Sequence, residues 1–581
     1  MIPDPPLAES HPIIRAKRRL GRARRYLARR WWARLNGREY RAWLEESDKV
    51  RAGSVENAVP IAVIVPVFDP PLEFLQECIA SVRNQSACHW QLIIVDDGST
   101  SPELQEYLAA LEEQTSGDER VAVIRGVNAG ISGAQNRGLD RVTCEYFGWL
   151  DHDDQLNPVA IESFSHAITD AKAPPAVVYS DEDKIDARGR HFELYCKPDY
   201  SPELLLTQMY LCHFTVFRTS DVRDAGGFDS AMDGAQDFDL ALRLMPGWSR
   251  ENVVHVPKPL YHWRSWEQST AQSIQAKPWA QQAAARAQHA HLLRSGLRGE
   301  VRPSTIAGLN EVHPEISVDP AEVCIIIPTA GVTDDAGVRF VDRAVDSLRD
   351  AHGGGDVEIV VVTTGDLQPI AGVDQQVTAP EGDFNFSRVI NAGRQQTRQP
   401  WLLLLNDDIE AASPDVIMNL LETASIPGVG VVGSRLIYPD GRLQHAGIVI
   451  LPSGPTHPFI GARAGHPGYF GSTLTPRNYA AVTAAAMLVR TSVFDSLGGF
   501  DEEFARDFND VDFCLRAWEA GSRVAWTPYA TFIHHEGVSL VRRSPDPRES
   551  ELFSRRWGSM LPDPWYSEAL HQSLGRLYQP L

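Results

Sequence analysis

The chain repeats itself, and this repetition constrains its fold more than any other feature. Five motifs of the first half return in the same order in the second half. The pairs are IAVIVPVFD (61–69) with VCIIIPTAG (323–331), LDHDD (150–154) with LNDDI (405–409), AGGFD (225–229) with LGGFD (497–501), QDFDLALR (236–243) with NDVDFCLR (509–516), and LYHWR with FIHHE, which aligns His262 with His534. From GGF to the histidine the offset stays near 272 residues. A chain of 581 residues is also too long for one core, so we expect two copies of one domain.

The repeat sets the expected domain boundaries. The two copies should occupy residues 56–300 and 321–545, separated by a proline-containing linker over 301–320. Residues 1–55 precede the first copy, and a tryptophan-rich tail, 546–581, follows the second.

Each copy alternates short apolar strands with helical segments. In the first copy, strands are expected at IAVIVPV, WQLIIVDDGS, VAVIRG and YFGWL, with helices at LEFLQECIASVRNQ, SPELQEYLAALEEQ and GISGAQNRGLDRV between them. This alternation predicts an α/β fold in each copy, Rossmann-like, with a mostly parallel sheet covered by helices on both faces.

Acidic residues follow two of these strands. Asp96 and Asp97 end the second strand, while Asp151 and Asp153 follow the fourth. Ligands bind at the carboxyl ends of parallel strands, so both pairs should reach one rim. Clustered carboxylates there suit a hard divalent cation, a sugar or a nucleotide ribose. An Asp-x-Asp pair can hold Mg²⁺ or Mn²⁺ and leave positions for phosphate oxygens.

Composition excludes several classes. The net charge of −21 argues against a general nucleic-acid binder. No apolar run approaches the roughly 20 residues of a membrane span, and no signal peptide is evident. Seven cysteines without a C-x-x-C pair are typical of reduced thiols in a cytosolic protein.

One segment is strongly basic, although the net charge of the chain is negative. Residues 15–38 carry eleven Lys and Arg and no acid, and a helix there would have one apolar stripe. The apolar residues are Ala16, Leu20, Ala23, Leu27, Trp31 and Leu35. Such a basic amphipathic helix predicts a peripheral anchor on an anionic membrane surface. The alternative is a solvated helix docked on the protein's own acidic body.

The ordered set of motifs resembles the inverting glycosyltransferases of family 2, which have the GT-A fold. Further matching stretches are YSDEDKID (179–186), KPDYSPELLL (197–206) and YHWRSWEQSTA (261–271) in the first copy, and FNFSRVINAG (384–393), LIYPDGRLQHAG (436–447) and FNDVDFCLRAWEAG (508–521) in the second. The likeness runs from about residue 60 to 545. It is closest to tandem transferases that build bacterial O-antigens and related surface polysaccharides, rhamnose-containing ones among them.

The resemblance implies roles for residues of the first copy. Nucleotide-sugar contacts fall to Phe68, Asp69, Asp96, Asn128, Gly130, Asn136 and Asp151. Asp153 and His262 would hold the metal, and Asp237 would be the general base. Displacement at the anomeric carbon needs a carboxylate on the acceptor side to take the hydroxyl proton. Without the resemblance, Asp237 would be an ordinary helix N-cap and His262 a strand-end histidine bonded to backbone.

The second copy implies a similar but altered set. Asp510 would be the base, while Asp408, with His534 or His535, would bind the metal. The nucleotide-sugar positions are Thr363, Asn391 and Asp407. VTTGD replaces VDDGS, so Thr363 stands where the first copy has Asp96.

The function implied is a bifunctional inverting glycosyltransferase that requires Mg²⁺ or Mn²⁺. It would move sugars from UDP- or dTDP-linked donors, dTDP-rhamnose among the candidates, to an oligosaccharide or lipid-linked acceptor. The expected location is cytoplasmic, peripheral on the inner face of the cytoplasmic membrane, with no nucleic-acid partner. One alternative keeps a single active copy and uses the second to bind acceptor. A nucleotidyltransferase and a purely polysaccharide-binding module are rivals, but PVFDPP and PTAGV lack a phosphate loop, and pure binding requires no base.

Overall fold

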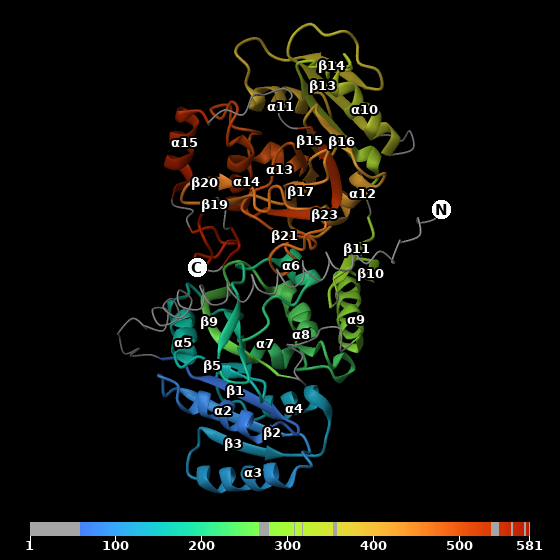
Figure 1. The fold of residues 1–581 in the computed structure, drawn as a ribbon. Helices are drawn as coiled ribbons and strands as arrows, with labels where there is room; N and C mark the ends of the chain where they lie inside the picture. Colours follow the sequence, from blue (N-terminus) through green and yellow to red (C-terminus); the bar gives the residue numbers. More distant parts are fainter. Residues whose placement is uncertain are drawn as a thin grey trace, which may run out of the picture.

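The computed structural model describes residues 58–266, 278–306, 308–316, 318–351, 357–535, 545–558, 562–573 and 577–579. The basic segment 15–38 lies outside the described residues, so the predicted N-terminal helix remains a prediction from sequence. Two domains lie one above the other, with the N-terminal β/α half of each at the far end (Figure 1).

The first domain is built on one large sheet. Its strand order is β3 (Val121–Arg125), β2 (Trp90–Asp96), β1 (Ile61–Val67), β4 (Tyr146–Trp149), β8 (Thr215–Arg218), β6 (Val177–Asp186), β9 (Val253–Ser265) and β5 (Gln155–Leu156), with β7 (His191–Tyr195) paired to β6. Alternate residues of a strand face opposite sides, so β1 divides between two cores. Ala62 and Ile64 pack toward one face, and Ile61 and Val63 toward the other.

Helices cover both faces of this sheet. The face of Ile61 carries α2 (Leu72–Arg83), α3 (Pro102–Thr115) and α5 (Ala160–Asp170). The opposite face carries α4 (Gly130–Leu139), α7 (Thr219–Asp224), α8 (Gln236–Leu244) and α9 (Pro278–Arg294), with α6 (Pro202–Thr207) in the same core.

The second domain has the same strand order. The order is β14 (Gln375–Thr378), β13 (Glu358–Thr363), β12 (Val323–Thr329), β15 (Trp401–Leu405), β22 (Ala486–Arg490), β17 (Val429–Ile437), β23 (Arg523–His534) and β16 (Ile409–Ala411), with β18 (Leu443–His445) and β21 (Arg477–Asn478) attached. One face carries α10 (Phe340–Ala351) and α12 (Val416–Ala424). The other carries α11 (Phe386–Arg394), α13 (Thr491–Ser496) and α14 (Asn509–Glu519). A hairpin of β19 (Val449–Leu451) and β20 (Gly454–Thr456) has no counterpart strands among the described residues of the first domain.

The sheets are less parallel than the sequence predicts. In the first domain β3, β2, β1 and β4 are all parallel, as expected. Beyond β4 the pairs β4–β8, β6–β8 and β5–β9 are antiparallel, and only β6–β9 is parallel. The prediction of a mostly parallel sheet is therefore wrong for this half. Its strands pair out of chain order, which local alternation of strand and helix does not reveal.

A closing helix ends the repeat in both domains. In the first, α9 packs against α8, and Arg294 of α9 lies 3.8 Å from Asp239 of α8. In the second, Arg556 and Trp557 of α15 (Pro547–Trp557) bond to Asp512 of α14 at 2.8 and 2.9 Å. The segment expected to be a tail thus contributes to the second domain. The segment expected to be a linker includes the hairpin of β10 (Gly299–Pro303) and β11 (Asn310–Pro314).

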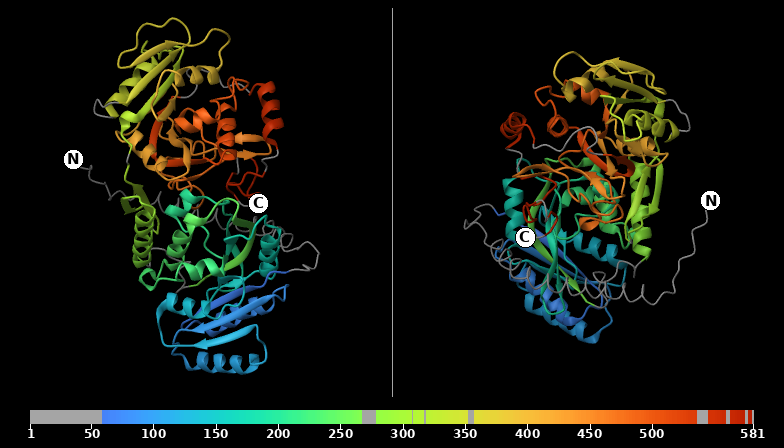
Figure 2. Two further views of the ribbon diagram at one scale, coloured as in Figure 1. Left: turned by 180° about the vertical axis from the view of Figure 1, so that it is seen from behind. Right: turned by 45° about the horizontal axis from the view of Figure 1, so that its top comes forward.

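Polar and aromatic contacts join the two domains. The Asn478 main-chain N–H donates to Ser201 Oγ at 3.2 Å, and Arg523 forms an ion pair with the buried Glu203 at 2.8 Å. Tyr195 also stacks on Phe470 of the second domain, with the two ring centroids 3.9 Å apart. Both views of Figure 2 show the domains meeting across this junction.

Candidate functional site

The parallel strands bring the predicted acids to one edge of each sheet. β1 lies between β2 and β4 and is parallel to both, so Asp96 and Asp151 come from the same edge. In the second domain β12 has the same relation to β13 and β15.

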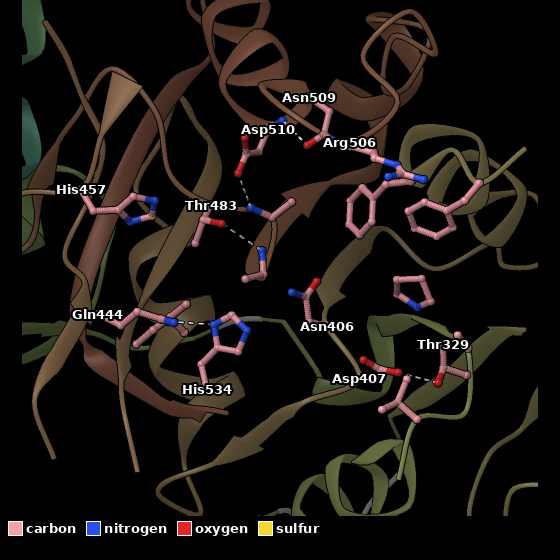
Figure 3. Close-up of a pocket in the computed structure, with 18 of the residues that line it drawn as sticks. Thr329, Asn406, Asp407, Gln444, His457, Thr483, Arg506, Asn509, Asp510 and His534 are labelled. Atoms are coloured by element: carbon pink, nitrogen blue, oxygen red, sulfur yellow. Dashed lines mark hydrogen bonds between the residues drawn. The ribbon is translucent and has the colours of Figure 1, made fainter. Parts of the chain in front are cut away.

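A cavity of about 550 Å³ opens at this edge of the second domain (Figure 3). Its lining combines the strand ends with the start of α14 and with loops that carry aromatic and cationic side chains. Polar lining residues are Thr329, Asn406, Asp407, Gln444, His457, Thr483, Arg506, Asn509, Asp510 and His534. Thus Asp407, Asp510 and His534, all predicted site residues, line one cavity. The other predicted site residues of this domain are absent from this lining among the described residues: Thr363, Asn391, Asp408 and His535.

Each predicted base lies in the first turn of a helix. Asp237 is the second residue of α8 and Asp510 the second of α14, and the N-caps are Ala235 and Phe508. Neither aspartate is therefore the helix N-cap that the sequence would predict without the family resemblance. Asp510 Oδ1 accepts from the Val511 N–H at 2.9 Å, and its Oδ2 accepts from the Ala484 N–H at 3.2 Å.

Burial raises the pKa of both carboxyls. For Asp510, burial outweighs the hydrogen bonds that oppose the rise. For Asp237, burial outweighs the opposing charge of His213 and the hydrogen bond from the Phe238 N–H, which is 2.8 Å long. A raised pKa makes each carboxylate a better proton acceptor, as a general base requires.

His534 lies between two partners in the second domain. Its Nδ1 lies 2.7 Å from Gln444 Oε1, and its Nε2 lies 3.1 Å from Asp408 Oδ1. An amide oxygen can only accept, so Nδ1 carries the proton, and Nε2 is the ring nitrogen that would bind a cation beside Asp408. Two neighbouring ligand atoms of an octahedral ion, each about 2.1 Å from it, stand about 3 Å apart. The pair Asp408 and His534 therefore fits a divalent cation.

The adjacent histidine faces elsewhere. His535 Nε2 lies 2.9 Å from Glu410, and the ring packs near Phe340. The structure separates the two histidines that the sequence left open, and His534 is the one that lines the cavity.

Asp407 has a different environment. Its Oδ2 accepts from the Thr329 hydroxyl at 2.6 Å. Burial raises its pKa to about 6, although the Thr329 hydrogen bond opposes the rise.

The aspartates that follow β4 in the first domain have different environments. Asp153 accepts a hydrogen bond from the Trp266 indole at 2.7 Å. Asp154 is fully buried and accepts from the Arg264 N–H at 2.7 Å and from the Tyr261 hydroxyl. Burial raises the pKa of Asp154 well above its usual range. Asp154 thus anchors the loop to β9, while the partly exposed Asp151 lies at its surface.

His262 belongs to a histidine–aspartate cluster. Its Nδ1 lies 2.6 Å from Asp183 Oδ1, and His191 Nδ1 lies 2.8 Å from Asp183 Oδ2. The ligand atoms of these three side chains lie within 4.8 Å of one another. The partner of His262 is thus a carboxylate, where the alternative interpretation expects backbone. A metal-binding histidine is often held in this way through its other ring nitrogen.

Two of the predicted nucleotide contacts, Phe68 and Asp69, are exposed at the rim of the first domain. Phe68 is 50% exposed. Asp69 accepts from the N–H groups of Thr100 and Ser101 at 2.8 and 3.0 Å, so its carboxylate orders the loop after β2. These bonds lower the pKa of Asp69, with Ser101 the largest cause.

The buried acid Asp96 and the start of α4 complete this rim. Asp96 accepts from the Ser99 N–H at 2.9 Å. Asn128 accepts from the N–H of Gly130 at 3.3 Å, and Gly130 has a φ of +77°. Thr363, the counterpart of Asp96, is 2% exposed, and its hydroxyl donates to the Val377 carbonyl at 3.4 Å.

Asn136 and Asn391 are engaged with backbone. The Asn136 amide donates to the Phe228 carbonyl and accepts from the Phe228 N–H, both at 2.8 Å. Asn391 makes the same pair with Phe500, at 2.9 and 3.0 Å. Each asparagine therefore fastens a helix, α4 or α11, to the GGFD loop. Their contact with the nucleotide stays a prediction from the family resemblance.

Sequence reasoning missed several charged residues near the first site. Burial opposes the charge on His213, but the carboxylates of Glu182, whose Oε2 lies 3.6 Å from the ring Nδ1, and of Asp151 and Asp154 together outweigh burial and raise the pKa of His213 to about 9. Glu182 also pairs with the fully buried Lys197 at 3.1 Å. Burial would raise the pKa of Glu182, but Lys197 and His213 lower it to about 2. Asp183 and His191 were missed too, although the acid-rich stretch YSDEDKID marked the strand.

Part of the chain matches a family model, and most of the chain aligns with curated relatives. Residues 62–226 match the family model described as glycosyl transferase family 2, so the first domain carries a family 2 glycosyltransferase domain. The chain is 36% identical over 540 residues to the uncharacterized protein y4gI of Sinorhizobium fredii, covering 89% of this chain and 58% of that protein. It is 33% identical over 555 residues to the O-antigen biosynthesis protein RfbC of Myxococcus xanthus, covering 92% of this chain and 42% of that protein.

The chain spans about half the length of these two curated relatives. Among solved structures, residues 1–349 of S. aureus TarS with UDP-GlcNAc align over 39% of this chain and 66% of that chain, at 18% identity and a TM-score of 0.31. Within the described residues, no helix is both long and apolar enough to cross a membrane.

Proposed function

We propose that the chain is a tandem glycosyltransferase of family 2 in which both domains transfer sugar. The observation that carries the proposal is the same set of groups in both domains. Each has a partly exposed aspartate in the first turn of a helix, Asp237 or Asp510, and a strand-end histidine, His262 or His534, held through Nδ1 by an acceptor. The family 2 match of residues 62–226 and the relative named for O-antigen biosynthesis support sugar transfer as the reaction.

The donors in this proposal are nucleotide-sugars, UDP- or dTDP-linked. The rim at Phe68, Asp69 and Asp96 would receive the base and ribose in the first domain. In the second, Ala330, Gly331 and Thr363 stand at the corresponding places, so its donor need not be the same.

The proposed cation is Mg²⁺ or Mn²⁺. Asp408 and His534 would hold it in the second domain, and Asp153 with His262 in the first. When bound, it would neutralise the negative charge that develops on the departing diphosphate. The pair of ligand atoms 3.1 Å apart supports this assignment.

The chain's own residues would carry out the rest. Asp237 or Asp510 would take the proton from the acceptor hydroxyl as its oxygen attacks the anomeric carbon, which inverts the configuration. Main-chain N–H groups fix both oxygens of Asp510, so the carboxylate is oriented before the acceptor arrives.

The acceptor we propose is a growing surface polysaccharide such as O-antigen, probed most simply as an oligosaccharide or lipid-linked saccharide. Residues 15–38 would bring the enzyme to the anionic inner face of the cytoplasmic membrane through positive charge and apolar insertion. This part of the proposal rests on the sequence alone.

A second candidate keeps one active domain. The loss of the acids at Thr363 and Asn406 favours a second domain that binds acceptor without transferring sugar. The retained Asp510, Asp408 and His534 favour activity, and we therefore place the two-site proposal first.

A donor screen tests both candidates. Release of nucleoside diphosphate from a panel of sugar nucleotides is measured for the intact protein, Asp237→Asn, Asp510→Asn and the double variant, with Asp440→Asn on an exposed loop as control. Two active sites predict that each single variant loses a different part of the activity and that the double variant loses all of it. An Asp510→Asn protein with unchanged activity and product length would leave the second domain as a binding module. Pyrophosphate release would instead indicate nucleotidyl transfer.

A further inference from the structure

The second domain has exchanged carboxylates for neutral groups around its site. The aligned motifs replace Asp69 by Gly331, Asp96 by Thr363 and Asp151 by Asn406. At these three positions the second domain carries less negative charge than the first, although Asp407 stands where the first domain has His152. A cavity with fewer carboxylates costs an anionic ligand less repulsion.

Arg506 adds a cation to the same cavity. It lies in the loop between the GGFD motif and α14, and its guanidinium lines the cavity. No carboxylate among the described residues forms an ion pair with this guanidinium. Its recorded neighbour is the Phe384 ring, whose centroid is 5.7 Å away. Arg388 and Arg394 of α11, by contrast, each have a glutamate or aspartate partner.

The backbone that carries Arg506 is fixed. Glu549 Oε2 accepts from the N–H groups of Arg506 and Asp507 at 3.3 and 2.7 Å, which ties the loop to α15. Phe508, next in the chain, stacks on Phe553 of the same helix at 4.9 Å. The main chain of this loop is therefore fixed, while the Arg506 guanidinium remains available to a ligand.

The position of Arg506 identifies which part of a ligand it would meet. In Figure 3 it lies beside Asn509 and Asp510, across the cavity from Asp407 and His534. The proposed diphosphate site is on the His534 side. A group that reaches Arg506 therefore belongs to the sugar or to the acceptor near the base. Arginine binds planar carboxylates through two parallel hydrogen bonds.

We propose that the second domain acts on an acidic sugar, whose carboxylate binds Arg506. This inference deepens the proposed function and rests on it. The carboxylate belongs either to the transferred sugar or to the terminal unit of the acceptor, and the two sources share the same chemistry at Arg506.

The test uses the full chain with Asp237→Asn, which leaves the second domain as the source of transfer. UDP release is measured with UDP-glucuronate and UDP-galacturonate against UDP-glucose and UDP-galactose. The acceptor arm compares p-nitrophenyl glucuronide with p-nitrophenyl glucoside. We expect a higher kcat/KM for the acidic partner in one arm, and that arm identifies the source of the carboxylate.

Substitution of Arg506 then tests the contact. Arg506→Gln should lower kcat/KM for the acidic substrate by roughly 10–100-fold, because a charge-assisted bond is lost, and leave the neutral substrate nearly unchanged. Arg506→Lys should restore part of the preference, since charge returns without the planar fork. Arg463→Gln, an exposed arginine outside the cavity lining, is the matched control.

Two results would overturn the inference: equal or better use of neutral substrates by the Asp237→Asn protein in both arms, or an equal loss for acidic and neutral substrates in Arg506→Gln. Failure of the proposed function looks different. In that case no sugar nucleotide releases nucleoside diphosphate even with both domains intact.

Discussion

Nε2 of His534 lies 3.1 Å from Oδ1 of Asp408, while the other ring nitrogen is held by Gln444. In the neutral ring this arrangement directs a lone pair at a carboxylate, which a cation between the two atoms would make favourable. In a background of Asp153→Asn, which removes the proposed ligand in the first domain, we expect Asp408→Asn or His534→Ala to weaken Mn²⁺ binding in the presence of UDP by tenfold or more. Electron paramagnetic resonance of free Mn²⁺ measures this directly.

Two further variants sharpen the metal prediction. Gln444→Ala should cost roughly tenfold, since it removes only the group that orients the ring. His535→Ala should bind Mn²⁺ normally, because that ring pairs with Glu410. Equal losses in all four variants, or full transferase activity in EDTA, would contradict the assignment.

The asparagines of α4 and α11 should matter for stability. Asn136→Ala and Asn391→Ala each remove two hydrogen bonds to the GGFD loop and strand a main-chain N–H and C=O. We expect a loss of about 2–4 kcal/mol in the free energy of unfolding, measured by urea denaturation. Asn128→Ala is the control, since its side chain accepts one longer bond from Gly130. A stable Asn136→Ala protein with weakened donor binding would favour the nucleotide role that the sequence suggested.

Alkaline pH should destabilise the first domain. The pKa of His213 is about 9 in the folded protein, above its usual value of 6.5, because Glu182 and the neighbouring aspartates outweigh the effect of burial. The stabilisation is therefore complete below about pH 6.5 and is lost as pH rises through 9. The drop in melting temperature between pH 6.5 and 9.5 should be smaller in His213→Gln than in the intact protein or in the surface variant His89→Gln. His255, whose pKa is also about 9, should leave part of the drop in place.

Membrane attachment is a prediction from the sequence of residues 15–38. Deleting residues 1–40 should move the protein from the membrane fraction to the soluble one and spare transfer to a short soluble acceptor. Each arginine near an anionic leaflet contributes on the order of 1 kcal/mol, and salt screens this part only. High salt should therefore loosen the intact protein without freeing it fully. Sedimentation of the shortened protein with anionic liposomes would disprove the anchor.

The sequence predicted the parts of the fold that depend on local patterns. The strands and helices from Ile61 to Trp149 follow from apolar periodicity, and the repeat gave the equivalence of Asp237 with Asp510. It did not predict the antiparallel half of either sheet. There, neighbours such as β8 and β6 are chosen by packing between segments far apart in the chain.

The same limit applies to the site. The partner of His262 is Asp183, 79 residues away, and only the pairing of β6 with β9 brings them together. The resemblance placed Asn136 in the nucleotide pocket, but its hydrogen bonds to the main chain of Phe228 depend on a contact 92 residues away that the sequence did not reveal. The sequence did not predict the raised pKa of His213, because only the fold brings Glu182 next to it.

The junction between the domains has a genetic consequence. Glu203 and Ser201 of the first domain are buried against Arg523 and Asn478 of the second, so neither half has a complete surface alone. A truncation that removes one domain should also destabilise the other. A deletion screen would therefore assign both domains to one function. Only point substitutions inside each site can separate the contributions of the two domains. Evolution can change the chemistry of one site only if the residues of the shared junction are preserved.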